Sequence, residues 1–136
     1  MTSATITDLI PHRAPFIMID TLVESSARRA LSALVVRADN ILVDEDGWFT
    51  ESGLVENMAQ TAAAGLREND AGAAPKIGYI GSLKNLSVLR LPAVGETIMT
   101  EAVFVQEIMG ARIVAATARL GDEVIARCEL RIFIQQ

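Results

Sequence analysis

The sequence contains a single cysteine, Cys128, and a single histidine, His12. One cysteine excludes a disulfide within the chain and suits a reducing compartment, so we expect a cytoplasmic protein. One cysteine and one histidine also supply too few of the usual ligands for a zinc site. Because no Gly-rich phosphate loop is present either, we expect neither a bound metal nor a cofactor.

Basic clusters and long apolar runs are missing as well. The formal net charge is -5 and the pI is about 4.8, which argues against nucleic acid as a partner. No apolar run approaches the roughly 18 residues of a membrane span, and we expect no signal peptide. The 136 residues contain no repeat and no linker, so we expect a single domain over residues 1–136.

The most informative stretch is residues 50–68, TESGLVENMAQTAAAGLRE, which predicts one long helix. Small and apolar side chains occur nearly all the way round it, as is typical of a helix buried in a core. We expect Thr50 or Ser52 as its N-cap. Glu56 and Gln60 are four residues apart and therefore share one face. A carboxylate in such a helix is costly unless it is paired, hydrogen-bonded or used, so Glu56 is the candidate catalytic residue.

Extended segments flank this helix on both sides. A curved antiparallel sheet around the helix buries it, because one helix cannot cover two faces of so large a sheet. We therefore predict an α+β fold with about six strands around one long central helix. Open sheet edges favour dimerisation. The predicted strands span residues 16–24, 31–37, 77–91, 97–108, 113–120 and 124–134, with loops at 39–49 and 69–75.

Three motifs connect this arrangement to a known family: PHRAPFIMID at 11–20, GLVENMAQ at 53–60, and IGYIGSLKNLSVLRLPAVGETI at 77–98. In this order, they resemble the hot-dog fold of 3-hydroxyacyl-[acyl-carrier-protein] dehydratases over nearly the whole chain. The short form with ENMAQTAAA is most similar to the dehydratase-like proteins of aryl-polyene and flexirubin pigment pathways.

The resemblance implies an active site at a dimer interface and a 3-hydroxyacyl thioester as substrate, on an acyl carrier protein or coenzyme A. In the family, a histidine of one subunit removes the C2 proton, and the helix carboxylate of the other protonates the departing hydroxyl. The N-terminus of the central helix polarises the thioester carbonyl. Glu56 stands at the position of the carboxylate, with Gly53 near the helix start. The implied partner is a second copy, in a dimer or higher oligomer, or a paralogue in a heterodimer.

The sequence departs from the family at the catalytic histidine, which normally lies in a His-Phe-Pro segment before the helix. Residues 47–50 read Gly-Trp-Phe-Thr, with Trp48 nearest the place of the histidine. His12 belongs to the PHR segment, which is structural in the family. Because His12 lies between two prolines, we expect a turn residue that bonds the backbone, and a base only if the fold brings it to Glu56.

The candidates for substrate binding are aromatic, amide and glycine residues near these motifs. Trp48 and Phe49 are expected to pack at a tunnel or interface, or to line an acyl pocket. Gln60 is expected to orient the helix carboxylate, to bond neighbouring strands or to contact substrate. Gly78 and Gly81 indicate either a β-bulge or a close approach of the backbone to a ligand.

Three functions stay open at this stage. The first is a dehydratase with Glu56 as the acid, and the second is a dehydratase-like subunit that binds acyl chains or partners an active paralogue. The missing motif histidine favours the second. The third is an acyl thioesterase in which Glu56 activates water. On the last strand, Cys128 is expected in the core, and Arg127 and Arg131 are expected as solvated charges or contacts to an acidic carrier protein.

Overall fold

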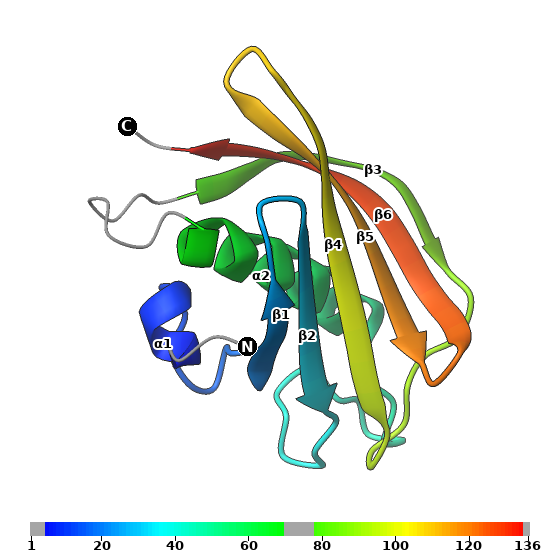
Figure 1. Ribbon diagram of the computed structural model, residues 1–136. Coiled ribbons are helices and arrows are strands. Elements are labelled where there is room, and N and C mark those ends of the chain that lie inside the picture. The colour runs from blue at the N-terminus through cyan, green and yellow to red at the C-terminus, as the bar shows by residue number, and fades with distance from the viewer. Residues whose placement is uncertain (1–4, 70–77, 135–136) are drawn as a thin grey trace.

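The structure is a computed structural model that describes residues 5–69 and 78–134. These residues form a six-stranded antiparallel sheet in the order β1-β2-β4-β5-β6-β3, so that β1 and β3 are its edges. The sheet curls around the long helix α2, and the short helix α1 contacts α2 (Figure 1). The predicted α+β hot-dog architecture is confirmed. The elements are α1 (Ile6–Leu9), β1 (Thr21–Ser25), β2 (Arg29–Val35), α2 (Glu51–Asn69), β3 (Gly78–Val88), β4 (Thr97–Ile108), β5 (Ala111–Leu120) and β6 (Glu123–Ile134).

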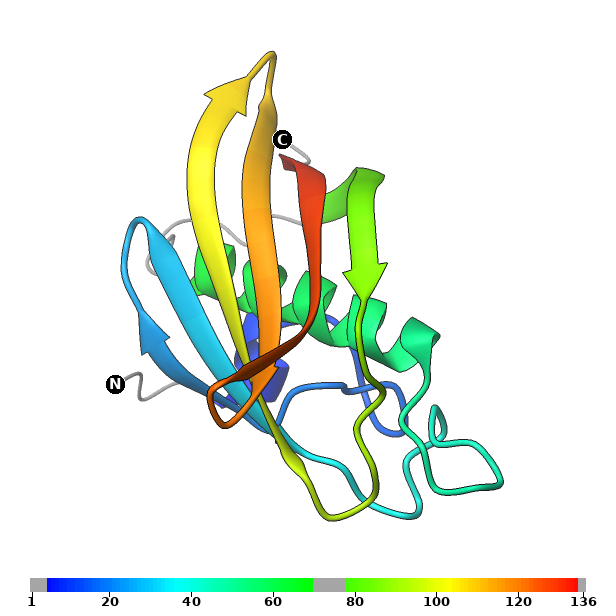
Figure 2. The same cartoon turned by 90° about the vertical axis from the view of Figure 1, so that its right-hand side faces the viewer.

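Helix α2 forms the centre of the core, with the sheet folded over it (Figure 2). Leu54, Met58 and Ala62 recur every four residues of the helix, and all three are completely buried. The sheet contributes inward-facing residues such as Val114 and Leu130. Burial of a Leu- or Met-sized side chain contributes roughly 1.5–3 kcal/mol, so this contact dominates the stability of the fold. Within the described parts of the chain, neither helix is long and apolar enough to cross a bilayer.

The prediction of a strand over 16–24 is wrong in its first half. Strand β1 begins only at Thr21. Asp20 N–H still bonds Ala33 of β2, but the backbone at Phe16 and Met18 bonds side-chain amides of α2 in place of a neighbouring strand. The apolar run at 16–19 is typical of a strand, but partners on the helix replace the neighbouring strand.

Gly81 lies at a β-bulge in the edge strand β3, as one of the two sequence alternatives predicts. The pairing register between β3 and β6 shifts between Ile80 and Ser82. A Cβ atom at Gly81 would lie 2.2 Å from the ring of Phe133, so the residue must be glycine for that ring to pack there. Gly78 is the first residue of the same strand. A ligand contact of either backbone stays a prediction.

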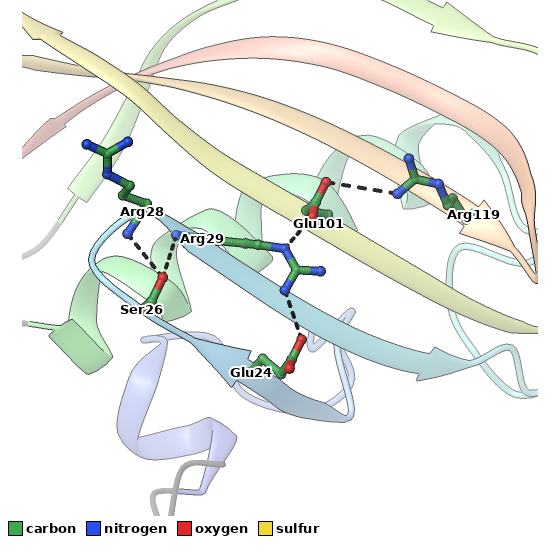
Figure 3. Close-up of polar contacts among 6 residues, drawn as sticks. All are labelled: Glu24, Ser26, Arg28, Arg29, Glu101 and Arg119. Atoms are coloured by element: carbon green, nitrogen blue, oxygen red, sulfur yellow. Dashed lines mark hydrogen bonds and ion pairs between the residues drawn. The ribbon is translucent and has the colours of Figure 1, made fainter.

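A row of charged side chains crosses four strands on the face of the sheet that points away from α2 (Figure 3). Arg29 of β2 bonds Glu101 of β4 and lies 2.8 Å from Glu24 of β1, while Arg119 of β5 lies 3.9 Å from Glu101. The hydrogen bonds that Arg29 donates to Glu101, and secondly to Glu24, raise the pKa of Arg29. Exposed pairs of this kind contribute at most about 1 kcal/mol each, so their main effect is to keep this face polar.

Candidate functional site

Helix α2 begins directly after Thr50, which is its N-cap. The hydroxyl of Thr50 accepts a hydrogen bond from Gly53 N–H at 3.3 Å and donates one to the carbonyl of Leu42 at 2.8 Å. Ser52, the alternative cap, lies within the first turn. The first N–H groups of an α-helix lack partners within the helix and carry partial positive charge. The start of α2 is therefore suited to bind the oxygen of a polarised carbonyl.

A depression of about 480 Å³ lies over this first part of the helix. Its size is within the range of small-molecule sites. Apolar and carboxylate side chains share its wall, which suits an acyl chain that carries a reactive polar group. The lining residues are Glu51, Ser52, Val55 and Glu56 of α2 with Leu86 of β3.

Glu56 lies on the wall of this depression, and its side chain is 47% exposed. Gln60, one turn further along α2, donates a hydrogen bond from Nε2 to Glu56 Oε2 at 3.1 Å. The carboxylate thus has solvent on one side and an amide donor on the other. These contacts explain how an otherwise apolar helix accommodates an acid at this position.

Two buried amides of α2 hold residues 10–19, which we call the strap. Gln60 accepts a hydrogen bond from Met18 N–H at 2.7 Å and donates one to Phe16 O at 3.0 Å. Asn57 donates to Met18 O at 2.8 Å. These three bonds give the backbone N–H and carbonyl groups of the strap the partners that a neighbouring strand would otherwise provide. They also fix the position of the strap along the helix.

The strap brings His12 to Glu56. His12 Nε2 lies 3.8 Å from Glu56 Oε2, and 34% of the histidine side chain is exposed. The distance allows electrostatic pairing but is longer than a hydrogen bond. Catalytic hydrogen bonds are often this long in a protein without substrate. The two residues therefore form a candidate acid–base pair within one chain.

The expectation that the His12 side chain bonds the backbone is wrong. Its second ring nitrogen, Nδ1, is buried and has no hydrogen-bond partner among the described residues. The turn is held instead by Arg13, whose guanidinium donates to the carbonyls of His12 at 2.7 Å and Ile10 at 3.1 Å. The sequence alone predicts a structural role for His12, because nothing in the local sequence shows which helix residue the strap reaches.

Asn57 connects the strap to the sheet through a buried polar network. Thr100 of β4 donates its hydroxyl to Asn57 Oδ1, and Thr61 donates to the Asn57 carbonyl at 2.7 Å. Because the Thr61 proton is used in that bond, Ser32 of β2 donates to Thr61 Oγ1, also at 2.7 Å. All four side chains are completely buried and bonded, so the helix turn that carries Glu56 is rigidly placed.

The two aromatic candidates before the helix occupy different environments. Phe49 is completely buried in the core, and a Cβ atom at Gly53 would lie 2.5 Å from its ring. Glycine at position 53 is therefore explained by the packing of this ring. Trp48 is exposed, and its backbone pairs with Ala93. A substrate contact of Trp48, Phe49 or Gly53 stays a prediction.

The candidates on β6 are a core thiol and two arginines. Cys128 is buried as expected, 3.8 Å from the sulfur of Met58, and burial raises the pKa of its thiol to about 11. Arg127 is exposed, whereas Arg131 is partly buried and its Nε has no hydrogen-bond partner among the described residues. A contact of these arginines to a carrier protein stays a prediction.

The matching family model and two related sequences are described as dehydratases. The model of the ApeP-like family, described as ApeP dehydratase, matches residues 4–136. The 3-hydroxyacyl-[acyl-carrier-protein] dehydratase FabZ of Acetivibrio thermocellus is 29% identical over 143 residues, 96% of this chain and 92% of that protein. FabZ of Vibrio vulnificus is 26% identical over 141 residues, 96% of this chain and 91% of that protein.

Solved structures share the fold. A chain of the dehydratase heterocomplex ApeI:P from Xenorhabdus doucetiae matches with a TM-score of 0.91 at 13% identity, over 99% of this chain and 93% of that one. A hypothetical thioesterase with coenzyme A from Streptococcus pneumoniae matches with a TM-score of 0.69 at 7% identity, over 85% and 84% of the two chains. At such identities these matches show the fold alone.

Proposed function

The chain belongs to the ApeP-like dehydratase family, and we propose that it eliminates water from a 3-hydroxyacyl thioester on an acyl carrier protein in the cytoplasm. The observation that carries this proposal is the 3.8 Å approach of His12 Nε2 to Glu56 Oε2. Elimination needs a base at C2 and an acid at the C3 hydroxyl. Glu56 supplies the acid from the wall of the depression at the start of α2, and His12 supplies the base in place of the histidine that the family carries before the helix.

In the proposed reaction, His12 Nε2 takes the C2 proton while the C2–H electron pair becomes the second bond between C2 and C3. The C3–O bond breaks, and the proton of Glu56 passes to the departing hydroxyl, which leaves as water. The first-turn N–H groups of α2 stabilise the negative charge that develops on the thioester oxygen.

The two residues then hold opposite charges, an imidazolium at His12 and a carboxylate at Glu56. Their separation of 3.8 Å lets the proton return from His12 to Glu56, directly or through one water molecule. The cycle thus closes without net uptake or release of protons by the protein.

A subunit that serves an active paralogue is the second candidate function. Two observations favour it: the acid–base pair is only partly covered in a single chain, and the matched structure from Xenorhabdus doucetiae is a heterocomplex. In this role, the depression holds the acyl chain and the partner supplies the remaining groups.

An assay on a 3-hydroxyacyl-carrier-protein decides between these functions. Wild-type protein and Glu56→Gln are incubated with the substrate, with and without a paralogous dehydratase, and enoyl product and free thiol are measured. Enoyl product from the wild type alone that disappears in the variant is the expected result. Turnover only with the paralogue present establishes the partner role, and free thiol without enoyl product overturns both in favour of a thioesterase.

A further inference from the structure

We propose that Leu86 is a specificity-determining residue that contacts the acyl chain of the substrate, and that Asn85 is the positioning residue that turns Leu86 towards it. This inference rests on the proposed function and adds to it the residue that selects chain length. Three observations carry it: a bulge in the edge strand β3, the backbone conformation of Asn85 and the lining of the depression.

Strand β3 contains one more residue than its partner β6 at this point. The two strands pair regularly up to Lys84 and again from Ser87, and the register shifts in between. Asn85 and Leu86 therefore lie together opposite the single residue Cys128. Two residues opposite one is the arrangement of a β-bulge, a feature that re-aims side chains and is common next to active sites.

The extra residue decides which way Leu86 faces. Side chains alternate between the two faces of a strand, so a shift by one residue exchanges the faces. Cys128 is buried against Met58 of α2, which identifies its face as the inner one. Without the bulge, position 86 would lie opposite Arg127, whose side chain is exposed. With the bulge, Leu86 packs against the core and reaches the wall of the depression.

The backbone of Asn85 is what forms the bulge. Its φ angle is +56°, in the left-handed region. Asparagine adopts this conformation more readily than most residues, whereas a β-branched residue rarely does. The side chain of Asn85 is exposed, so core packing does not explain this residue. An unusual backbone conformation beside a site indicates that the geometry it produces is used there.

Leu86 offers the depression an apolar surface. Among the described residues that line it, four belong to α2 and Leu86 alone belongs to the sheet. Leu86 is only partly buried, so its side chain is available for contact. Because Glu56 acts at C3 in the proposed reaction, the carbons beyond C3 are the part of the substrate that contacts Leu86. One methylene group in an apolar pocket changes kcat/KM by about tenfold or more, so this contact distinguishes long chains from short ones.

The test compares kcat/KM for 3-hydroxyoctanoyl- and 3-hydroxybutyryl-carrier-protein in the wild type, Leu86→Ala and Leu83→Ala. Leu83 is the matched control, because it packs against the same core from β3 but does not line the depression. We expect the wild type to prefer the longer chain. This preference should fall at least about fivefold in Leu86→Ala and stay within about twofold in Leu83→Ala. An unchanged preference in Leu86→Ala, or an equal fall in both variants, overturns the proposal. Leu86→Val replaces Leu86→Ala if that variant does not fold.

Two substitutions of Asn85 test its positioning role. Asn85→Gly should keep the wild-type preference, because glycine adopts the left-handed conformation freely. Asn85→Val should lose the preference as Leu86→Ala does, and it should cause no further loss in the Leu86→Ala background. A preference that survives in Asn85→Val, or a further loss in the double variant, shows that Asn85 does not act through Leu86.

A second readout does not depend on activity. Octanoyl and butyryl thioesters of N-acetylcysteamine lack the 3-hydroxyl and cannot lose water, so they report binding alone. His12 is the only histidine and lies beside Glu56, so its imidazole C–H resonances in a proton NMR spectrum follow the titration. We expect Kd for the octanoyl thioester to rise at least about fivefold in Leu86→Ala, with Kd for the butyryl thioester within about twofold. An unchanged Kd for the octanoyl thioester overturns the proposal. An inactive wild type that shows the expected difference contradicts the proposed function and leaves the role of Leu86 supported.

Discussion

At the scale of single residues, the chemistry centres on one atom, Glu56 Oε2. His12 Nε2 lies 3.8 Å from this oxygen, and Gln60 Nε2 donates to it at 3.1 Å. The same oxygen therefore faces both the proposed base and the side-chain amide of Gln60.

A second titratable residue has a consequence for stability rather than catalysis. Burial raises the pKa of Cys128 from its ordinary value of 9.0 to about 11. Between these values the unfolded chain has lost the thiol proton and the folded chain retains it. Stability is therefore lost as the pH rises from about 9 to about 11, by up to roughly 2–3 kcal/mol.

Urea unfolding of the wild type and Cys128→Ala between pH 8 and pH 10.5 measures this effect, with the variant as the control for all other titrating groups. We expect the stability advantage of the wild type over the variant to shrink steadily above about pH 9. An advantage that stays constant over this range would show that the thiol does not contribute.

At the scale of elements, the junction between the loop before α2 and its first turn depends on one close contact. The ring of Phe49 occupies the space that a Cβ atom at Gly53 would need, at a separation of 2.5 Å. Alanine is favoured over glycine in a helix by about 1 kcal/mol, whereas overpacking a core costs about 1–3 kcal/mol. The cost of the clash between an added Cβ atom and the Phe49 ring therefore exceeds the gain in helix propensity.

We therefore expect Gly53→Ala to destabilise the protein by about 1–2 kcal/mol in urea unfolding, and the same substitution to be neutral or stabilising in a Phe49→Leu background. The double-mutant cycle separates the ring contact from any general effect on the helix. An equal loss in both backgrounds would place the cause elsewhere.

The elements differ in how far the sequence predicts them. Helix α2 and strand β4 follow from side-chain periodicity, and the predicted span of β4 coincides with the observed one. The strap is different because its backbone bonds side-chain amides more than 35 residues away. Its apolar run is therefore typical of a strand, although no strand forms there. The pattern of the helix itself singles out Glu56 as a candidate catalytic residue. The approach of His12 to Glu56 depends on the distant amide contacts of the strap, so the sequence does not predict it.

At the scale of the whole molecule, the sheet has two open edges, β1 and β3, and large apolar residues are exposed on it. Ile80 is one of them and lies on β3, which also contributes Leu86 to the depression beside Glu56. A second subunit at this edge would cover both the apolar surface and the site. Assembly and activity are therefore expected to depend on each other.

Light scattering during size-exclusion chromatography tests this dependence with Ile80→Glu and, as control, Val105→Glu. Val105 is also an exposed apolar residue, but it lies on the inner strand β4, away from the edge strand β3. We expect the wild type and Val105→Glu to form dimers and Ile80→Glu to be monomeric, because a buried unpaired charge opposes association. Dimers in all three proteins would show that the subunits do not associate at the β3 edge.

The measurement that tests the central claim most directly is kcat/KM for dehydration of a 3-hydroxyacyl-carrier-protein by the wild type, His12→Asn, Glu56→Gln and the double variant. The pair is predicted to act as one unit, so each single variant should lose on the order of 10²–10⁴ in kcat/KM and the double variant little more. Unfolding in urea shows whether each variant keeps its fold. If His12→Asn retains the wild-type rate while Glu56→Gln abolishes it, His12 is not the base and the account is contradicted.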